Sequence, residues 1–273
     1  MDNLLVSLTD KLSTPAVFPM RPSEVQQLAL MRTETVHCGP YRSRVLISQG
    51  PTQAAKKALV LHGWGGHPLM LAQAKDILLA QGYEVYLPFL LGHDPQTPAP
   101  CDFPAQCQLL LTLQNTFGAF DTVVAHSAGG LITALSASLG FRFSRLVLMS
   151  VPASFTSLLQ HYLRQNHLPE SYLAPLCAWY QARFPAPEMP ATDSLFALGD
   201  IPALILQGQQ DTRINPADAW KIHRQLPGSQ LALIEHTGHL GVLTHQRTQY
   251  ELNAFLRTAN ADPEKRSHYV GSH

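Results

Sequence analysis

A serine stands where an apolar run meets two glycines. In "DTVVAHSAGGL" (121–131), Ser127 follows a β-branched run and precedes Gly129 and Gly130. This pattern is typical of a sharp strand-to-helix turn, whose strained backbone exposes a serine hydroxyl and requires small neighbours. Ala125 takes the place of the first glycine in G-x-S-x-G, which is a conservative departure. Taken alone, the pentapeptide is better explained as an ordinary serine cap of a helix.

Two residues further along the chain could activate such a serine. A nucleophilic serine needs a base to take its proton and an acid to orient that base. Asp211 lies just past a predicted strand (203–208), and His239 lies in the loop after another (230–236). His236 is the alternative base, but its place nearer the strand end suits a structural role better.

Other aspartates and histidines near these strands fit less well. Asp200 precedes its strand and so lies at the wrong edge of the sheet, and Asp193 belongs to a proline-rich return. Asp218 falls inside a predicted helix, where a solvated surface position is expected. Most of the other histidines are expected to be polar surface, because only 14% of the residues are charged.

A glycine-rich turn could supply the remaining part of such a site. The stretch "HGWGG" (62–66) follows an earlier apolar run. A backbone N–H in such a turn can stabilise a developing oxyanion. We expect the N–H groups of Trp64 and Ala128, the residue after the serine, to form this oxyanion hole.

The elements that must position these residues alternate along the chain. Apolar runs predict strands at 57–63, 83–88, 121–127, 145–151, 203–208 and 230–236. Amphipathic segments predict helices at 68–82, 105–120, 128–140, 215–228 and 241–259. Two antiparallel edge strands are expected upstream, at 32–39 and 43–49. Alternation of this kind predicts a doubly wound, mostly parallel α/β sheet, and reactive groups collect at the carboxyl ends of its strands.

One segment interrupts the alternation. Residues 152–200 carry no strand signal but contain two helix-like pieces, which predicts a small helical cap. The expected division is an N-terminal helical extension (1–34), a core (35–151 and 201–258), the cap, and a polar tail (259–273). Substrate choice is expected to reside in the cap, whose aromatic residues either line an acyl pocket or join the cap to the core. The candidates for substrate binding are Phe155, Tyr162 and Trp179. The loop containing His93 and Asp94 is expected to form the opposite wall of the cleft.

Composition excludes several classes of protein. The 19 basic and 19 acidic residues balance, which argues against an electrostatic nucleic-acid footprint or a polybasic membrane surface. The N-terminus is a poor signal peptide and no apolar run is long enough to span a membrane, so a cytoplasmic location is expected. The four cysteines show no zinc spacing and predict free thiols, with a Cys101–Cys107 bridge left open.

Taken together, the four motifs are specific. The order "HGWGG", "AHSAGG", "GQQD", "TGH", each after a strand, resembles the α/β-hydrolase superfamily, of the serine esterase and lipase kind, over residues 35–258. The resemblance implies an eight-stranded, mostly parallel sheet in which Ser127 is the nucleophile, Asp211 the acid and His239 the base. It implies no metal or organic cofactor. A serine in this strand-to-helix turn argues against dehalogenases and epoxide hydrolases of the superfamily, which carry an aspartate nucleophile at that position.

The expected activity is hydrolysis of carboxylic esters with small to medium acyl chains, through an acyl-enzyme. A thioesterase, an acyltransferase or a C–C bond hydrolase with the same triad is the alternative. A non-catalytic ligand receptor on this fold is a third hypothesis, which the presence of all three triad residues disfavours. The expected partner is a small-molecule ester, without nucleic acid or membrane insertion, and a homodimer stays open.

Overall fold

Eight strands form one sheet in the part of the chain that the computed structural model describes, which is residues 3–49, 56–183 and 194–258. Their order across the sheet is β1-β2-β4-β3-β5-β6-β7-β8. The pairs β1–β2 and β2–β4 are antiparallel and all the others are parallel, which confirms the predicted mostly parallel sheet with an antiparallel edge. The strands are β1 (Arg32–Cys38), β2 (Tyr41–Ser48), β3 (Lys56–Leu61), β4 (Tyr83–Pro88), β5 (Phe120–His126), β6 (Phe143–Met149), β7 (Ala203–Gly208) and β8 (Ser229–Ile234).

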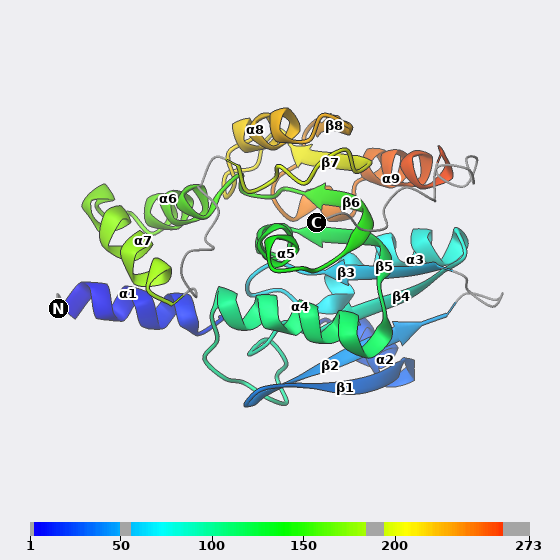
Figure 1. Cartoon of the computed structure of the whole chain (residues 1–273), viewed down its shortest axis with the longest axis horizontal. Helices are drawn as coiled ribbons and strands as arrows, with labels where there is room; N and C mark the ends of the chain where they lie inside the picture. The colour runs from blue at the N-terminus through cyan, green and yellow to red at the C-terminus, as the bar shows by residue number, and fades with distance from the viewer. Residues whose placement is uncertain (1–2, 50–55, 184–193, 259–273) are drawn as a thin grey trace.

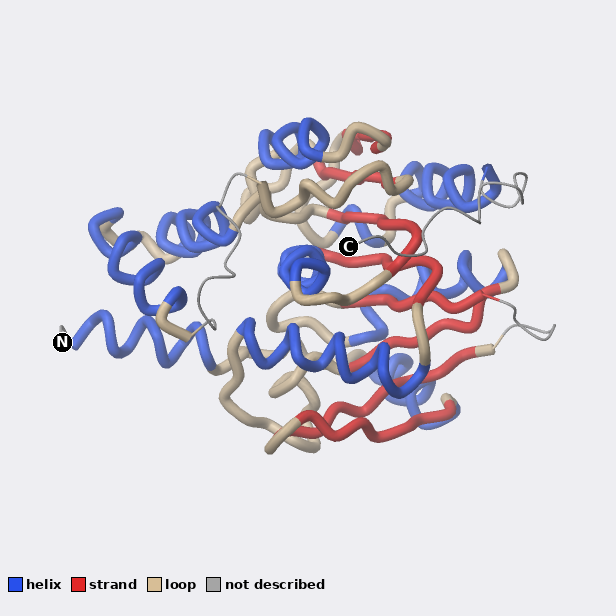
Figure 2. The backbone as a smooth tube through the Cα atoms, viewed as in Figure 1, coloured by secondary structure: helices blue, strands red, loops and turns tan. Residues whose placement is uncertain are grey.

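Helices cover both faces of the sheet, as a doubly wound fold requires (Figures 1 and 2). One apolar cluster joins the sheet to α4, α5 and α8, and a second cluster joins it to α3 and α9. The central strands are buried on both faces, which explains why they are continuous apolar runs. The helices are α1 (Asn3–Ser13), α2 (Pro22–Leu30), α3 (Ala72–Ala80), α4 (Phe103–Phe117), α5 (Ala128–Ser138), α6 (Phe155–Gln165), α7 (Leu173–Gln181), α8 (Ala217–Gln225) and α9 (Gln246–Thr258).

The helices α6 and α7 lie beyond the carboxyl ends of the strands. Figure 1 shows them with α1 on the left, the side to which the arrows of β5 and β6 point. Aromatic rings join them to the core, with Phe155 at 4.4 Å from Tyr180 and 5.1 Å from Phe103 between centroids. Residues 184–193 of the expected cap and the expected tail (259–273) lie outside the described residues, and the domain boundaries stay a prediction.

Two expectations drawn from composition can be compared with this fold. All four cysteines, Cys38, Cys101, Cys107 and Cys177, are free thiols, so the bridge that the sequence left open is not formed. In the described ranges, every helix is too short or too polar to cross a bilayer.

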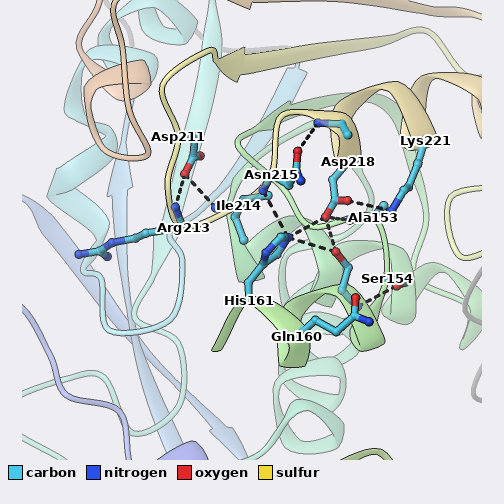
Figure 3. Close-up of polar contacts among 12 residues, drawn as sticks. Ala153, Ser154, Gln160, His161, Asp211, Arg213, Ile214, Asn215, Asp218 and Lys221 are labelled. Atoms are coloured by element: carbon cyan, nitrogen blue, oxygen red, sulfur yellow. Dashed lines mark hydrogen bonds and ion pairs between the residues drawn. The ribbon is translucent and has the colours of Figure 1, made fainter. Parts of the chain in front are cut away.

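A buried carboxylate joins α6 to α8. Asp218, at the start of α8, is 1% exposed, so the expectation of a solvated surface residue was wrong. Its Oδ2 accepts hydrogen bonds from the hydroxyl of Ser157, the backbone N–H of Ala153 (3.2 Å) and Nε2 of His161 (3.2 Å), all in or next to α6 (Figure 3). Lys221 lies 3.3 Å from its other oxygen. The helical period of α8 alone could not reveal this, since the donors lie more than fifty residues away.

These contacts favour the charged form of Asp218. Burial by itself raises the pKa of the carboxyl, but the hydrogen bonds from His161, Ser157 and Ala153 outweigh it and lower the pKa to about 2. A carboxylate with a depressed folded-state pKa stabilises the fold above its unfolded pKa, and the stabilisation is lost as the pH falls through the folded value.

Replacing this carboxylate should therefore destabilise the protein in a pH-dependent way. We expect Asp218→Ala to lower the free energy of unfolding by about 3 kcal/mol at pH 7, because three donors lose a buried acceptor. The cost should shrink as the pH falls from 5 toward 3. Urea titrations at each pH measure it, with Asp76→Ala as the control because the Asp76 side chain is 64% exposed. A cost that is equal in both variants, or constant with pH, would contradict the assigned anchor.

Candidate active site

Ser127 occupies a strained turn between β5 and α5. Its backbone has φ +52° and ψ −126°, a conformation that residues other than glycine rarely adopt. The turn is held by its N–H, which donates to the carbonyl of Met149 in β6 at 3.0 Å. The side chain makes no capping hydrogen bond to α5, so the alternative of an ordinary helix cap does not apply.

Two glycines allow the neighbouring chain to approach this turn. A Cβ added at Gly129 would lie 2.7 Å from the carbonyl oxygen of His62, and one at Gly63 would lie 2.8 Å from Cβ of Ser127. Distances this short exclude any side chain without a backbone shift. The glycine-rich turn 62–66 therefore packs directly against the serine.

The predicted serine, histidine and aspartate are brought together. Nε2 of His239 lies 3.0 Å from Oγ of Ser127, and Nδ1 of His239 lies 2.9 Å from Oδ2 of Asp211. The Asp211 side chain is fully enclosed, whereas the His239 side chain is 9% exposed. Since the carboxylate can only accept, Nδ1 of His239 carries the proton and Nε2 is free to accept one from the serine.

Asp211 is held by its own loop. Its Oδ1 accepts the backbone N–H groups of Arg213 (2.8 Å) and Ile214 (2.9 Å), and Gln207 donates to Oδ2 at 3.2 Å. Burial raises the pKa of the carboxyl, but His239 and the N–H of Ile214 outweigh it and keep the pKa below its usual value. The carboxylate is therefore charged at neutral pH and fixes the orientation of the imidazole.

The other histidines near the site differ from what the sequence led us to expect. His236 is exposed in the turn after β8, whereas His126 is buried against His239 with ring centroids 4.7 Å apart. Nε2 of His126 lies 3.1 Å from the carbonyl oxygen of His239 and donates to it. Burial and the neighbouring His239 lower the pKa of His126 to about 3, so it is neutral. The small-x-Ser pattern gave no signal for this contact.

The two predicted oxyanion donors belong to segments that adjoin the serine. Ala128 begins α5, and Trp64 sits in the turn that Gly63 brings against Ser127. Within the described ranges, neither backbone N–H is given a protein acceptor, so both are available to a ligand. The indole of Trp64 stacks on the ring of Phe103 with 5.5 Å between centroids, so α4 helps to hold the glycine-rich turn in place.

A reciprocal pair of buried histidines braces the same turn. Nε2 of His62 accepts the N–H of Leu90 at 3.1 Å, and Nε2 of His93 accepts the N–H of Gly65 at 3.0 Å. Each ring donates its Nδ1–H to a carbonyl of its own segment. Burial lowers the pKa of His93 to about 4 and that of His62 well below its usual value. Both rings are neutral acceptors, and the expectation of a surface position was wrong for these two histidines.

The N-terminal segment and the loop after β4 complete this support. The N–H of Phe18 donates to the carbonyl of Gly65 at 2.7 Å, so the chain after α1 crosses the glycine-rich turn. Asp94 is 3% exposed and forms a bidentate pair with Arg44. Because His93 is fully buried as well, these two residues support the turn from within, and a place for their loop in the opposite wall of the cleft stays a prediction.

The three predicted substrate-binding residues are not gathered around Ser127 by any described contact. Phe155 is 3% exposed and packs on other rings. Trp179 contacts Tyr180 edge-on at 4.5 Å and carries the guanidinium of Arg183 over its face at 3.6 Å. Tyr162 packs against the core cluster. These contacts favour the alternative in which the aromatic residues join the cap to the core, and a binding role stays a prediction.

Within the described ranges, no group of three or more His, Cys, Asp or Glu side chains is placed to hold a metal ion. What the arrangement offers is a serine hydroxyl, a base oriented by a carboxylate, and two unused N–H groups. These parts can transfer an acyl group through a tetrahedral intermediate.

Comparison with known proteins agrees with this geometry. The profile of the "Alpha/beta hydrolase family" matches residues 58–250. Curated proteins gave no match. Similar solved structures include the Pyrococcus furiosus esterase Pf2001 (13% identity, 91% of this chain, 97% of that chain, TM-score 0.67). Another is Est1E from Butyrivibrio proteoclasticus, with 14% identity over 84% of this chain and 99% of that chain and a TM-score of 0.65. A thermophilic esterase from Thermogutta terrifontis has 18% identity over 83% of this chain and 98% of that chain, with a TM-score of 0.61. At these identities the solved structures show the fold alone.

The hydrogen bond from Gly65 to His93 should contribute to the reactivity of Ser127. His93→Leu removes the acceptor of the Gly65 N–H, so the turn that carries Trp64 should loosen and labelling of Ser127 by a fluorophosphonate should slow by about tenfold or more. The rate of labelling at pH 7.5 measures the effect. The matched control is His37→Leu on β1, where the side chain is exposed. Equal labelling rates in the two variants, with circular dichroism spectra like the wild type, would show that the brace does not support the serine.

Proposed function

The chain belongs to the alpha/beta hydrolase family, and we propose that it is a serine hydrolase that cleaves carboxylic esters of small to medium acyl chain. One observation carries the proposal, which is the pair of hydrogen bonds that links Ser127 to His239 at 3.0 Å and His239 to Asp211 at 2.9 Å. The strained backbone of Ser127 supports it further, because such strain persists where the surrounding structure holds a functional side chain in place.

In the proposed first step, Oγ of Ser127 attacks the ester carbonyl while Nε2 of His239 takes the hydroxyl proton. The carbonyl oxygen becomes an oxyanion and accepts hydrogen bonds from the N–H groups of Trp64 and Ala128. The tetrahedral intermediate then collapses, the bond to the alcohol oxygen breaks, and His239 returns its proton to that oxygen. The acyl group stays on Ser127 as an ester.

In the proposed second step, water replaces the alcohol. His239 removes a proton from the water as its oxygen attacks the acyl-enzyme, and then returns the proton to Oγ of Ser127 as the acid leaves. The charged Asp211 stabilises the imidazolium that forms twice in the cycle. His126 adds no opposing charge beside it, because burial keeps that ring neutral. No metal or organic cofactor is required.

Two of the similar solved structures are named as esterases, which favours esters over the alternative substrates. A thioesterase, an acyltransferase and a C–C bond hydrolase would use the same three residues. Parallel assays with p-nitrophenyl esters of increasing chain length and with acyl-CoA thioesters separate ester from thioester cleavage. A ligand receptor is disfavoured, because an intact hydrogen-bonded triad has no role in ligand binding alone.

The nucleophile assignment is tested by Ser127→Ala. We expect turnover of p-nitrophenyl butyrate to fall by about three orders of magnitude or more, because no other group supplies the attacking oxygen. Thermal melting should change little, since only one oxygen atom is lost. If the alanine variant kept more than a few per cent of the wild-type turnover, another residue would be the nucleophile.

The choice of base is tested by a matched pair, His239→Gln and His236→Gln. The first variant should lose both turnover and fluorophosphonate labelling, because glutamine cannot take the proton of Ser127. The second should keep both, since His236 is exposed outside the hydrogen-bonded chain. Similar losses in both variants, with unchanged melting temperatures, would defeat the assignment of His239.

A further inference from the structure

A polar cavity of about 350 Å³ lies between α6 of the cap and the loop after β7. Its lining differs from the aromatic acyl pocket that the sequence suggested, because no Phe, Tyr or Trp side chain contributes. The lining residues are His161, Arg164, Gln165, Asp211, Thr212, Asn215 and Pro216. Figure 3 shows the side chains of His161, Asp211 and Asn215 around this junction.

The carboxylate of Asp211 does not set the charge of the cavity. Its side chain is fully enclosed, and its oxygens are engaged by His239, Gln207 and two backbone N–H groups. The other carboxylate nearby, on Asp218, is equally buried and is satisfied by the start of α6. Both negative charges therefore face the protein interior.

Arg164 supplies a positive charge that no carboxylate of the described residues neutralises. The residue is exposed, and its Nη2 donates to Nδ1 of His161 at 3.0 Å. Nε2 of the same ring faces Asp218 at 3.2 Å and the backbone N–H of Asn215 at 3.3 Å. Within the described ranges, no carboxylate lies within ion-pair distance of Arg164.

The remaining polar side chains of the cavity have hydrogen-bonding groups that could bind a ligand. Asn215 uses its Oδ1 to accept the N–H of Ala217 at 2.9 Å, which leaves its Nδ2 as a donor. In the described part of the chain, the hydroxyl of Thr212 and the amide of Gln165 form no hydrogen bond that would occupy them. A guanidinium, an amide N–H₂ and a hydroxyl beside one cavity match an oxygen-rich anion.

We propose that this cavity is a subsite for a carboxylate carried by the substrate, held by Arg164 with Thr212 and Asn215. The inference rests on the proposed ester hydrolysis and narrows its substrate class to esters that carry a negative charge. The cavity borders the proposed triad, because its lining residue Asp211 is hydrogen-bonded to His239, which in turn contacts Ser127.

Matched neutral and anionic esters test the subsite. The mono-4-nitrophenyl ester of glutaric acid carries a carboxylate on the acyl side, 4-acetoxybenzoate carries one on the alcohol side, and 4-nitrophenyl valerate and phenyl acetate are their neutral counterparts. We expect the wild type to prefer at least one anionic ester to its neutral counterpart. Arg164→Gln should lower kcat/KM for that ester by about tenfold to a hundredfold and leave the neutral ester unchanged.

Two further variants make the result specific. Arg164→Lys keeps the charge but loses the planar fork, so we expect an intermediate loss. Arg224→Gln removes the same charge from an exposed position on α8 outside the cavity, and should leave both ratios unchanged. Equal loss in Arg224→Gln and Arg164→Gln would reduce the effect to net charge and overturn the subsite.

A binding measurement separates failure of the subsite from failure of the proposed function. Calorimetry with glutarate and the Ser127→Ala variant requires no turnover. Binding that is lost in Ser127→Ala/Arg164→Gln and weakens with salt supports the subsite even if no ester is cleaved. Wild-type cleavage of neutral esters, with no glutarate binding and no preference for either anionic ester, would overturn the subsite and leave the hydrolase proposal standing.

Discussion

The strained backbone of Ser127 is the constraint on which the rest of the site depends. A φ of +52° places the hydroxyl beyond the end of β5, and the hydrogen bond to Met149 in β6 keeps it there. The turn fits only because Gly129 and Gly63 let it pack directly against the end of β3 and the glycine-rich turn. Parallel strands bring the loops with Asp211 and His239 to the same edge of the sheet. The sheet thus positions a serine, a base and an acid that lie far apart in the sequence.

Three neutral histidines lie close to the proposed base, His239, or to the glycine-rich turn beside it. His62 and His93 act as hydrogen-bond acceptors that hold the glycine-rich turn, and His126 holds the backbone of His239. Burial lowers the pKa of all three, so none carries a charge near neutral pH. An imidazolium that forms on His239 is then stabilised by Asp211, and none of these three rings adds a positive charge beside it. The rigid surroundings support the two N–H groups proposed to bind the oxyanion.

Sequence reasoning reached the sheet and the three hydrogen-bonded residues because their signals are local. Apolar runs, the small residues around Ser127 and the positions just past strand ends can be read one segment at a time. Burial of His93 and Asp218 could not be read in this way, since their partners lie 28 or more residues away. Low overall charge suggested polar surface histidines, whereas enclosed polar groups are satisfied by tertiary hydrogen bonds that no window of sequence displays.

In the proposed mechanism, Ser127 becomes acylated because His239, oriented by Asp211, removes its proton. Its most direct test is mass spectrometry of the protein quenched in acid within milliseconds of mixing with p-nitrophenyl butyrate. We predict a butyryl increment on the peptide that contains Ser127, formed together with the release of nitrophenol and absent in His239→Gln. Release of nitrophenol with no increment on that peptide, or an increment on another residue, would contradict the account.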